Sequence, residues 1–379
     1  MLATIVNRSA RVKIRDISVT LVEIPLTKVF VGSTYRIETR STVIVKVETD
    51  EGVTGEIYCG DERTYFRQIR DLILGPFKEV LIGEDVFAVE RIWTKLFAMT
   101  PVLGDKKVAM EAISAVDVAL WDTIGKALGA PVYKLLGGSK TEIPVIGIGY
   151  FEEGLDPEGV GEAMLEQKEL GYAGTKLKAG YGPIEDDVAR AVATRKATGD
   201  DFILAADPNL AWTVEEAIEF GHGVSEIDLA WLEEPVRWHN QFEGMARVRQ
   251  VTSVPVTAGQ SELSGFGCFE MMKAGAVDFL NVDVSIAGGI TEWRRIAAAA
   301  QYFGVRMVHH EEPHISLHLL CGVPHSFCGE VFQDPVREPV WHYMYPGHPE
   351  VKDGKMSPLD EPGLGLHIDP DFVKRYEVA

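Results

Sequence analysis

The stretch Phe202-Ile203-Leu204-Ala205-Ala206-Asp207 is a short apolar run that ends in a carboxylate, and similar runs recur downstream. Leu229–Leu232 leads into Glu233, and Val254–Gly259 comes shortly before Glu262. Each run is followed by residues with helical periodicity, which is how a parallel barrel presents side chains at the C-terminal ends of its strands. Three carboxylates would repel one another there unless a cation lay between them. The pattern therefore predicts a hard divalent metal and an enzyme.

Strand-like runs recur along most of the chain and alternate with helical segments. The runs lie at 142–151, 173–179, 202–207, 229–234, 254–260, 277–283, 305–310 and 327–332. Segments such as 214–221 and 291–303 fill most gaps with helical periodicity. Eight such units favour a barrel over an open, doubly wound sheet.

The N-terminal region has a different pattern, which indicates a separate α+β domain. Residues 12–24 and 42–58 alternate in strand fashion, with a turn at 50–52, and we expect a loop over 26–35. The pattern is helical from about 64 to 136, most strongly over 110–126. We place an N-terminal domain at 1–140, the barrel at 141–340, and at 341–379 a tail that packs back on the first domain.

Composition narrows the class of protein. The net charge of −20 disfavours binding to nucleic acid or anionic membranes, since both need a basic patch. No apolar run approaches the roughly 18–20 residues that span a bilayer, and the N-terminus lacks the apolar core of a signal peptide. Four cysteines without a CxxC pair predict buried, reduced thiols. We expect a cytoplasmic protein.

Basic side chains lie near the ends of the second and seventh strand-like runs of the predicted barrel. Lys176 and Lys178 share one face of a strand, where each should depress the proton affinity of the other, although such a pair also fits a solvated edge strand. Asp283 could hydrogen-bond His310 and raise its basicity. A lysine and a histidine with a divalent cation between them suit removal of a proton α to a carboxylate, because the cation stabilises the enediolate.

Two residues are candidates for the third ligand of the metal. If the fifth strand continues far enough, Gln260 and Glu262 share a face, and either could reach the metal. A carboxylate is the stronger ligand for Mg²⁺.

The chain resembles the mandelate racemase subgroup of the enolase superfamily over nearly its full length. The stretch Ala115–Asp122, with Lys126 and Leu135–Gly138, looks like that family's junction of cap and barrel, and Lys176-Leu177-Lys178 looks like its KxK motif. The resemblance implies a modified TIM barrel, (β/α)7β, under an α+β capping domain formed by the N-terminal region and the C-terminal tail. It also implies a homo-oligomer, from dimer to octamer.

The resemblance implies a role for each matched residue. Lys178 is the base, assisted by Lys176, and Asp283 with His310 matches the family's His–Asp dyad. Glu330 matches the acid that hydrogen-bonds a substrate carboxylate oxygen. Asp207 and Glu233 match two Mg²⁺ ligands, whereas Gln260 stands where a glutamate is usual, so we expect Glu262 to replace it.

These residues predict a small carboxylate as substrate and leave the reaction open. Dehydration of an acid sugar to a 2-keto-3-deoxy acid in carbohydrate catabolism is the first choice. Racemisation or epimerisation of a 2-hydroxy acid is the alternative, and a non-catalytic binding protein is the third. Asn209 and the cap residues Tyr35, Arg36 and Tyr58 are candidate substrate contacts.

Overall fold

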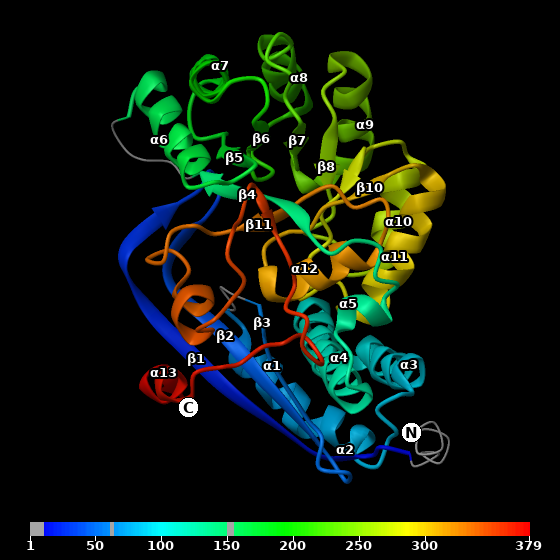
Figure 1. The fold of residues 1–379 in the computed structure, drawn as a ribbon. Helices are drawn as coiled ribbons and strands as arrows, with labels where there is room; N and C mark the ends of the chain where they lie inside the picture. Colours follow the sequence, from blue (N-terminus) through cyan, green and yellow to red (C-terminus); the bar gives the residue numbers. More distant parts are fainter. Residues whose placement is uncertain (1–10, 61–63, 150–154) are drawn as a thin grey trace.

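The computed structural model describes residues 11–60, 64–149 and 155–379, in two parts that Figure 1 shows together. A ring of short strands surrounded by helices forms one part. An antiparallel sheet with its own helices forms the other, which we call the cap. The expected class, a modified TIM barrel with an α+β cap, is confirmed.

The barrel has its strands where the apolar runs predict them. They are β4 (Ile143–Gly149), β5 (Gly174–Lys178), β6 (Ile203–Asp207), β7 (Trp231–Glu233), β8 (Val256–Ala258), β9 (Phe279–Leu280), β10 (Arg306–Met307) and β11 (Gly329–Val331). Neighbours pair in parallel from β4 to β10, and β11 pairs with β4. The ring closes where Met307 N donates to His325 O at 3.0 Å and Phe327 N donates to Met307 O at 2.8 Å.

One helix separates each pair of consecutive strands in the described part of the barrel. These helices are α6 (Pro157–Glu169), α7 (Ile184–Thr198), α8 (Val214–Gly223), α9 (Gln241–Thr252), α10 (Gly265–Lys273), α11 (Gly289–Phe303) and α12 (Pro313–Gly322). This alternation is the (β/α)7β order.

Strand alternation decides which side chains point into the barrel, and these form an apolar layer below a polar one. An apolar cluster plugs the interior, and it consists of Ile146, Ala205, Trp231, Phe279, Val308 and Cys328. Side chains two residues further along a strand point to the same face, one layer closer to its C-terminal end. That layer holds Asp207, Glu233, Asn281, His310 and Glu330. The plug thus forms a dry floor beneath the polar mouth.

The cap sheet consists of β1 (Ile14–Val31), β2 (Arg36–Thr49) and β3 (Thr54–Cys59), and β13 (Glu377–Val378) pairs with β1. The predicted turn at 50–52 is confirmed by the bond from Gly52 N to Thr49 O. The loop predicted over 26–35 is wrong for most of its length. β1 continues to Val31 after a register shift, because the branched and aromatic residues there suit a strand, and only 32–35 form the turn.

The α-helices of the N-terminal region in the described cap are α1 (Phe66–Leu72), α2 (Lys78–Leu81), α3 (Val89–Met99), α4 (Lys106–Leu128) and α5 (Val132–Leu135). The helix predicted over 110–126 is the buried core of α4. Asp105 caps its first turn by accepting from Lys107 N and Val108 N, and Gly129 ends it with φ 65°. Figure 1 shows α4 between the cap sheet and the barrel.

The tail joins both parts. β12 (Lys355–Met356) pairs with β4, and α13 (Pro370–Tyr376) leads into β13 on the cap sheet. The tail thus contacts the barrel through β12 and the cap sheet through β13, and the three domain ranges stay predictions. The four cysteines are buried thiols.

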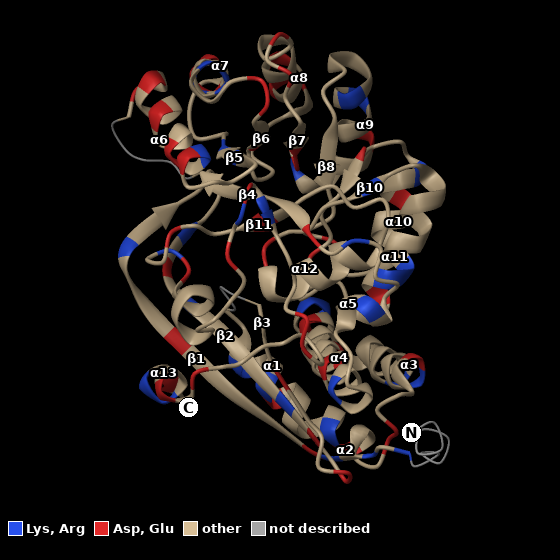
Figure 2. Cartoon of the chain, viewed as in Figure 1, with Lys and Arg blue, Asp and Glu red and all other residues tan. Residues whose placement is uncertain are grey.

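Surface charge and helix length bear on possible partners. Figure 2 shows acidic and basic residues interspersed along the cap and the outer barrel helices. Among the residues that the structure describes, no helix combines the length and the apolar character needed to cross a membrane.

Candidate active site

Two carboxylates lie at the mouth of the barrel, at the ends of their strands. Asp207 ends β6 and Glu233 ends β7, and both side chains are inaccessible to solvent. Lys176 and Lys178 on β5 are also buried, and Lys178 is in register with Asp207. The structure thus brings four of the predicted residues into one group, which excludes a solvated edge strand for the lysines.

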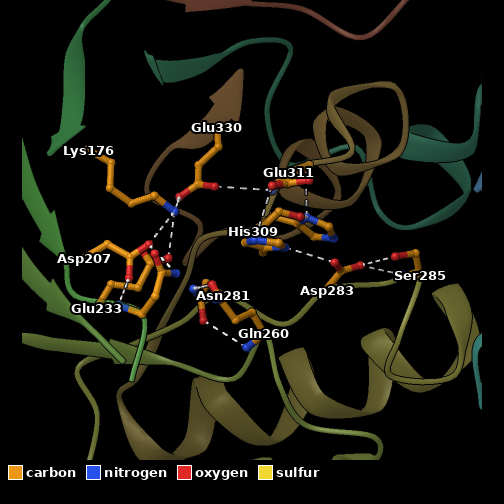
Figure 3. A network of polar contacts seen from close by, with 12 residues as sticks. Lys176, Asp207, Glu233, Gln260, Asn281, Asp283, Ser285, His309, Glu311 and Glu330 are labelled. Carbon is orange, nitrogen blue, oxygen red and sulfur yellow. Dashed lines mark hydrogen bonds and ion pairs between the residues drawn. The ribbon is translucent and has the colours of Figure 1, made fainter. Parts of the chain in front are cut away.

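The lysines pair with the carboxylates in a network (Figure 3). Lys176 Nζ lies 2.7 Å from Glu233 Oε1, 2.6 Å from Glu330 Oε1 and 3.7 Å from Asp207 Oδ2. Lys178 Nζ donates to Asp207 Oδ2 at 2.7 Å and to Asn209 Oδ1 at 3.2 Å. Lys176 therefore bridges carboxylates from other strands, whereas Lys178 pairs with one carboxylate and one amide oxygen.

The expected depression of the Lys178 pKa is wrong for the site in this state. Burial lowers the pKa of Lys178 and Lys176 also lowers it, but the Asp207 carboxylate outweighs both and raises it above its ordinary value. The same balance, with Glu233 and Glu330 as partners, raises the pKa of Lys176. The carboxylates, rather than the neighbouring lysine, decide the protonation of these groups.

The group contains more carboxylates than lysines, as a binding site for a cation requires. Burial raises the pKa of Glu233 to about 7, and the charges of Asp207 and Glu330 add to the rise. Buried carboxylate oxygens are ligands that Mg²⁺ accepts. In the described ranges, no three His, Cys, Asp or Glu side chains converge on one metal position, since the lysines hold the carboxylates. The donors of Asp207 and Glu233 nevertheless fit the chemistry of a hard dication.

The predicted dyad is formed on the neighbouring strands. His310 Nδ1 lies 3.0 Å from Asp283 Oδ2, and Ser285 Oγ donates to Asp283 Oδ1 at 2.5 Å. Burial lowers the pKa of His310, but Glu311 and Asp283 outweigh it and raise the pKa to about 10. The imidazole is therefore protonated at neutral pH.

Both predicted bases face one cavity of about 280 Å³. The turn between β1 and β2 covers its rim, where Ser33 Oγ donates to Pro208 O at 2.6 Å and Thr34 Oγ1 donates to Asn209 O at 3.3 Å. The lining consists of Thr34, Tyr35, Lys107, Lys178, Asn209, Leu210, Glu234, Gln260, Ser261, Asp283, Ile286, His310, Glu311 and Arg337.

Gln260 lines the cavity, and Glu262 does not. Gln241 Nε2 donates to Glu262 Oε1 at 2.8 Å, and the carboxylate lies against Gly267, where a Cβ would come within 1.7 Å of Oε2. β8 ends at Ala258, so strand alternation no longer puts Glu262 beside Gln260. The structure therefore does not bring Glu262 to the carboxylate group.

Two candidate substrate contacts lie elsewhere, whereas Tyr35 and Asn209 line the cavity. Arg36 is exposed and pairs with Glu38 at 2.8 Å. Tyr58 is buried and stacks on His314, with 3.7 Å between ring centroids.

Sequence reasoning missed several residues of the lining. Glu234 follows Glu233 directly and Glu311 follows His310, and successive residues of a strand are expected to point apart, so the pattern marks only one of each pair. Arg337 lies beyond the last strand, where no periodicity marks it.

Comparison with known proteins agrees with the fold. Residues 15–137 match the mandelate racemase/muconate lactonizing enzyme N-terminal domain, and residues 160–372 match the enolase C-terminal domain-like family. D-galactarolactone cycloisomerase of Agrobacterium fabrum is 31% identical over 97% of this chain and 99% of its own. Arabinonate dehydratase of Saccharolobus solfataricus is 29% identical over 88% of this chain and 90% of its own.

Solved structures agree as well. A mandelate racemase/muconate lactonizing enzyme from a marine actinobacterium, in complex with magnesium, superposes with a TM-score of 0.90 at 38% identity, covering 97% of this chain and 100% of that one. The chain therefore belongs to the mandelate racemase/muconate lactonizing enzyme family of the enolase superfamily.

Proposed function

We propose that the protein is a Mg²⁺-dependent enzyme that removes the α-proton of a 2-hydroxy carboxylate, and that its reaction is dehydration of an acid sugar. One observation carries the proposal: Lys178 and the His310–Asp283 dyad, from different strands, face the same cavity beside buried carboxylates. Two proton-transfer groups on either side of one carbon are what an enediolate mechanism needs.

Asp207 and Glu233 would hold Mg²⁺, which supplies electrostatic stabilisation of the enediolate oxygens. The Asp207 carboxylate pairs with Lys178 and keeps it protonated. If Asp207 held the metal instead, it would stabilise the ammonium less, and Lys178 could lose its proton and act as a base. Lys176 stays charged between Glu233 and Glu330, where it stabilises negative charge that develops on the substrate.

The protonated His310 is suited to dehydration. A departing 3-hydroxyl needs a proton, and an imidazolium near neutral pH can give it. The dehydratase among the relatives agrees with this choice. Racemisation or epimerisation uses the same two groups and remains the second candidate.

The test is a screen of acid sugars with Mg²⁺, read by the reaction of semicarbazide with the 2-keto product. We expect a hit that Lys178→Ala or His310→Asn reduces by roughly 10²–10⁴-fold, the usual contribution of general acid–base catalysis. Product without semicarbazide reactivity, but with exchange of the α-proton in D₂O, would favour racemisation or epimerisation. The absence of both activities across the library would contradict the proposal and favour a binding protein.

A further inference from the structure

Glu311 lies beside the ring nitrogen of His310 that a substrate would meet. Asp283 Oδ2 lies 3.0 Å from His310 Nδ1, so the opposite ring nitrogen, Nε2, is the one left for a substrate. Glu311 Oε1 lies 3.6 Å from that Nε2. Both His310 and Glu311 line the cavity of about 280 Å³. The imidazole therefore has a carboxylate beside each of its two nitrogens.

The backbone of Glu311 is held in an unusual conformation. Its φ of 52° lies in the left-handed region that residues other than glycine rarely adopt, and such a conformation persists where the surroundings hold it. Glu311 N donates to Glu330 Oε2 at 3.3 Å (Figure 3), and Glu311 O lies 3.2 Å from His309 Nδ1. Since a carbonyl oxygen can only accept, His309 Nδ1 carries the proton in this contact.

His309 also connects the Glu311 segment to the dyad. Its Nδ1 donates to His310 O at 2.8 Å, and its Nε2 accepts from Val284 N at 3.3 Å, directly after Asp283. The loop that carries Asp283 and the segment that carries His310 and Glu311 are therefore joined through one neutral imidazole. This connection holds both carboxylates in place around His310.

The two carboxylates act on His310 in different ways. Asp283 accepts a hydrogen bond from Nδ1, whereas the 3.6 Å between Glu311 Oε1 and Nε2 is too long for a hydrogen bond and leaves a charge–charge attraction. Such an attraction stabilises the protonated ring without using the Nε2–H. A substrate oxygen can then accept the hydrogen bond from Nε2 while the charge of the ring is maintained.

The charges around His310 agree with this geometry. Burial lowers the pKa of His310, but nearby carboxylates outweigh it and raise the pKa to about 10; they are those of Glu311, Asp283 and Glu330. Burial lowers the pKa of His309, and the charge of His310 adds to the fall. Other charged and titratable groups that line the same cavity are Tyr35, Lys107, Lys178, Glu234 and Arg337.

We propose that Glu311 is a positioning residue for proton transfer, whose carboxylate keeps the substrate-facing nitrogen of His310 protonated and leaves its N–H available to a departing hydroxyl. This inference rests on the proposed function. Lys178 takes the α-proton, the C3–O bond breaks, and the Nε2 proton leaves with the hydroxyl as water. Glu311 stays ionised throughout and acts through His310, so it does not need to touch the substrate.

The test follows the protonation of His310 by NMR of protein labelled with ¹⁵N-histidine, without substrate, and the signal is assigned by its loss in His310→Asn. The wild-type ring should stay protonated up to about pH 9. In Glu311→Gln the ring should lose its proton at least about one pH unit lower, the effect of removing one opposite charge within about 4–6 Å. Glu243→Gln makes the same chemical change at an exposed position of α9 and should leave the titration unchanged.

A second pair of variants separates charge from shape. Glu311→Asp and Glu311→Asn are alike in size, and both new residues tolerate the left-handed backbone, so they test the charge even where Glu311→Gln fails to fold. The ring of His310 should keep its proton to a higher pH in the Asp variant than in the Asn variant. Equal titrations of His310 in the charged and uncharged proteins would overturn the inference.

Kinetics with the substrate found in the screen give a readout that packing alone does not change. Between about pH 7 and 9, kcat of Glu311→Gln should fall roughly three- to tenfold relative to the wild type, because the fraction of protonated His310 declines. A loss of kcat by the same factor at both pH values would indicate a structural role and overturn the inference. A shifted titration without conversion of any acid sugar would instead contradict the proposed function, so the two failures are distinguishable.

Discussion

The pKa values of two adjacent histidines at the barrel mouth are shifted in opposite directions. Burial lowers the pKa of His309, whose Nδ1 faces the carbonyl oxygens of His310 and Glu311. Burial also acts on His310, but the carboxylates of Glu311 and Asp283 raise its pKa to about 10. The residue type alone would assign the same charge to both, and the neighbouring carboxylates make one of them an acid.

The raised pKa of His310 predicts a pH-dependent stability. In the unfolded chain a histidine has a pKa of about 6.5, so the stabilisation is fully present below pH 6.5 and is lost as the pH rises toward 10. Between these limits, the free energy of unfolding of the wild type should fall by about 1–3 kcal/mol more than that of His310→Gln. Urea unfolding at several pH values measures this, and parallel curves would refute it.

At the scale of elements, cap helix α4 supports the start of barrel helix α11. Thr291 N and Oγ1 donate to the Asp117 carboxylate at 2.9 and 2.6 Å, and Trp121 Nε1 donates to Thr291 Oγ1 at 3.0 Å. Burial raises the pKa of Asp117 to about 7. The carboxylate thus satisfies donors that the first turn of α11 cannot pair within the helix.

Asp117→Ala should lower the free energy of unfolding by roughly 2–3 kcal/mol, because it leaves buried donors on Thr291 without their acceptor. Thr94→Ala removes an exposed hydroxyl bonded within α3 and should cost less than about 1 kcal/mol. Equal losses in the two variants, measured by urea unfolding, would contradict the support assigned to Asp117.

The β1–β2 turn is an element whose contact affects substrate binding. Ser33→Ala removes the hydrogen bond to Pro208 O at the cavity rim without disturbing the sheet. We expect KM for the substrate found in the screen to rise by about 3–10-fold, the effect of one hydrogen bond, with an unchanged melting temperature. A fall in kcat with constant KM would show that the turn affects chemistry instead of binding.

At the scale of the whole molecule, a buried ion pair connects the cap to the barrel. Arg40 on β2 is fully buried and pairs with Glu338, beyond the last barrel strand, while its Nε donates to Arg337 O at 3.1 Å. Arg337 in turn lines the cavity. Cap docking and the shape of the site are therefore coupled.

Removing one member of this pair leaves a buried charge. Arg40→Met should lower the free energy of unfolding by about 3–5 kcal/mol, and Arg40→Met with Glu338→Gln should lose less than the sum of the single variants. A double-mutant cycle in urea measures the coupling. Additive losses would show that the two residues act separately.

The sequence predicted the ring of strands and most of the polar layer because both depend on local alternation. An apolar residue in the plug fixes the direction of the side chain two positions later, so Asp207, Glu233, His310 and Glu330 follow from strand position. The prediction of a loop over 26–35 was wrong because pairing with β2, together with the branched and aromatic residues of the segment, extends β1 to Val31.

The sequence by itself determined the barrel and the residues at the strand ends, because periodicity and spacing are local properties of the chain, and its motifs carried the resemblance to the family. Tertiary structure alone decided the rest of the site. Gln241 holds Glu262 away from the cavity, Asn281 orients Gln260, and Arg337 reaches the site from beyond the barrel. These outcomes depend on contacts between distant segments, and on burial that shifts pKa values, neither of which local sequence encodes.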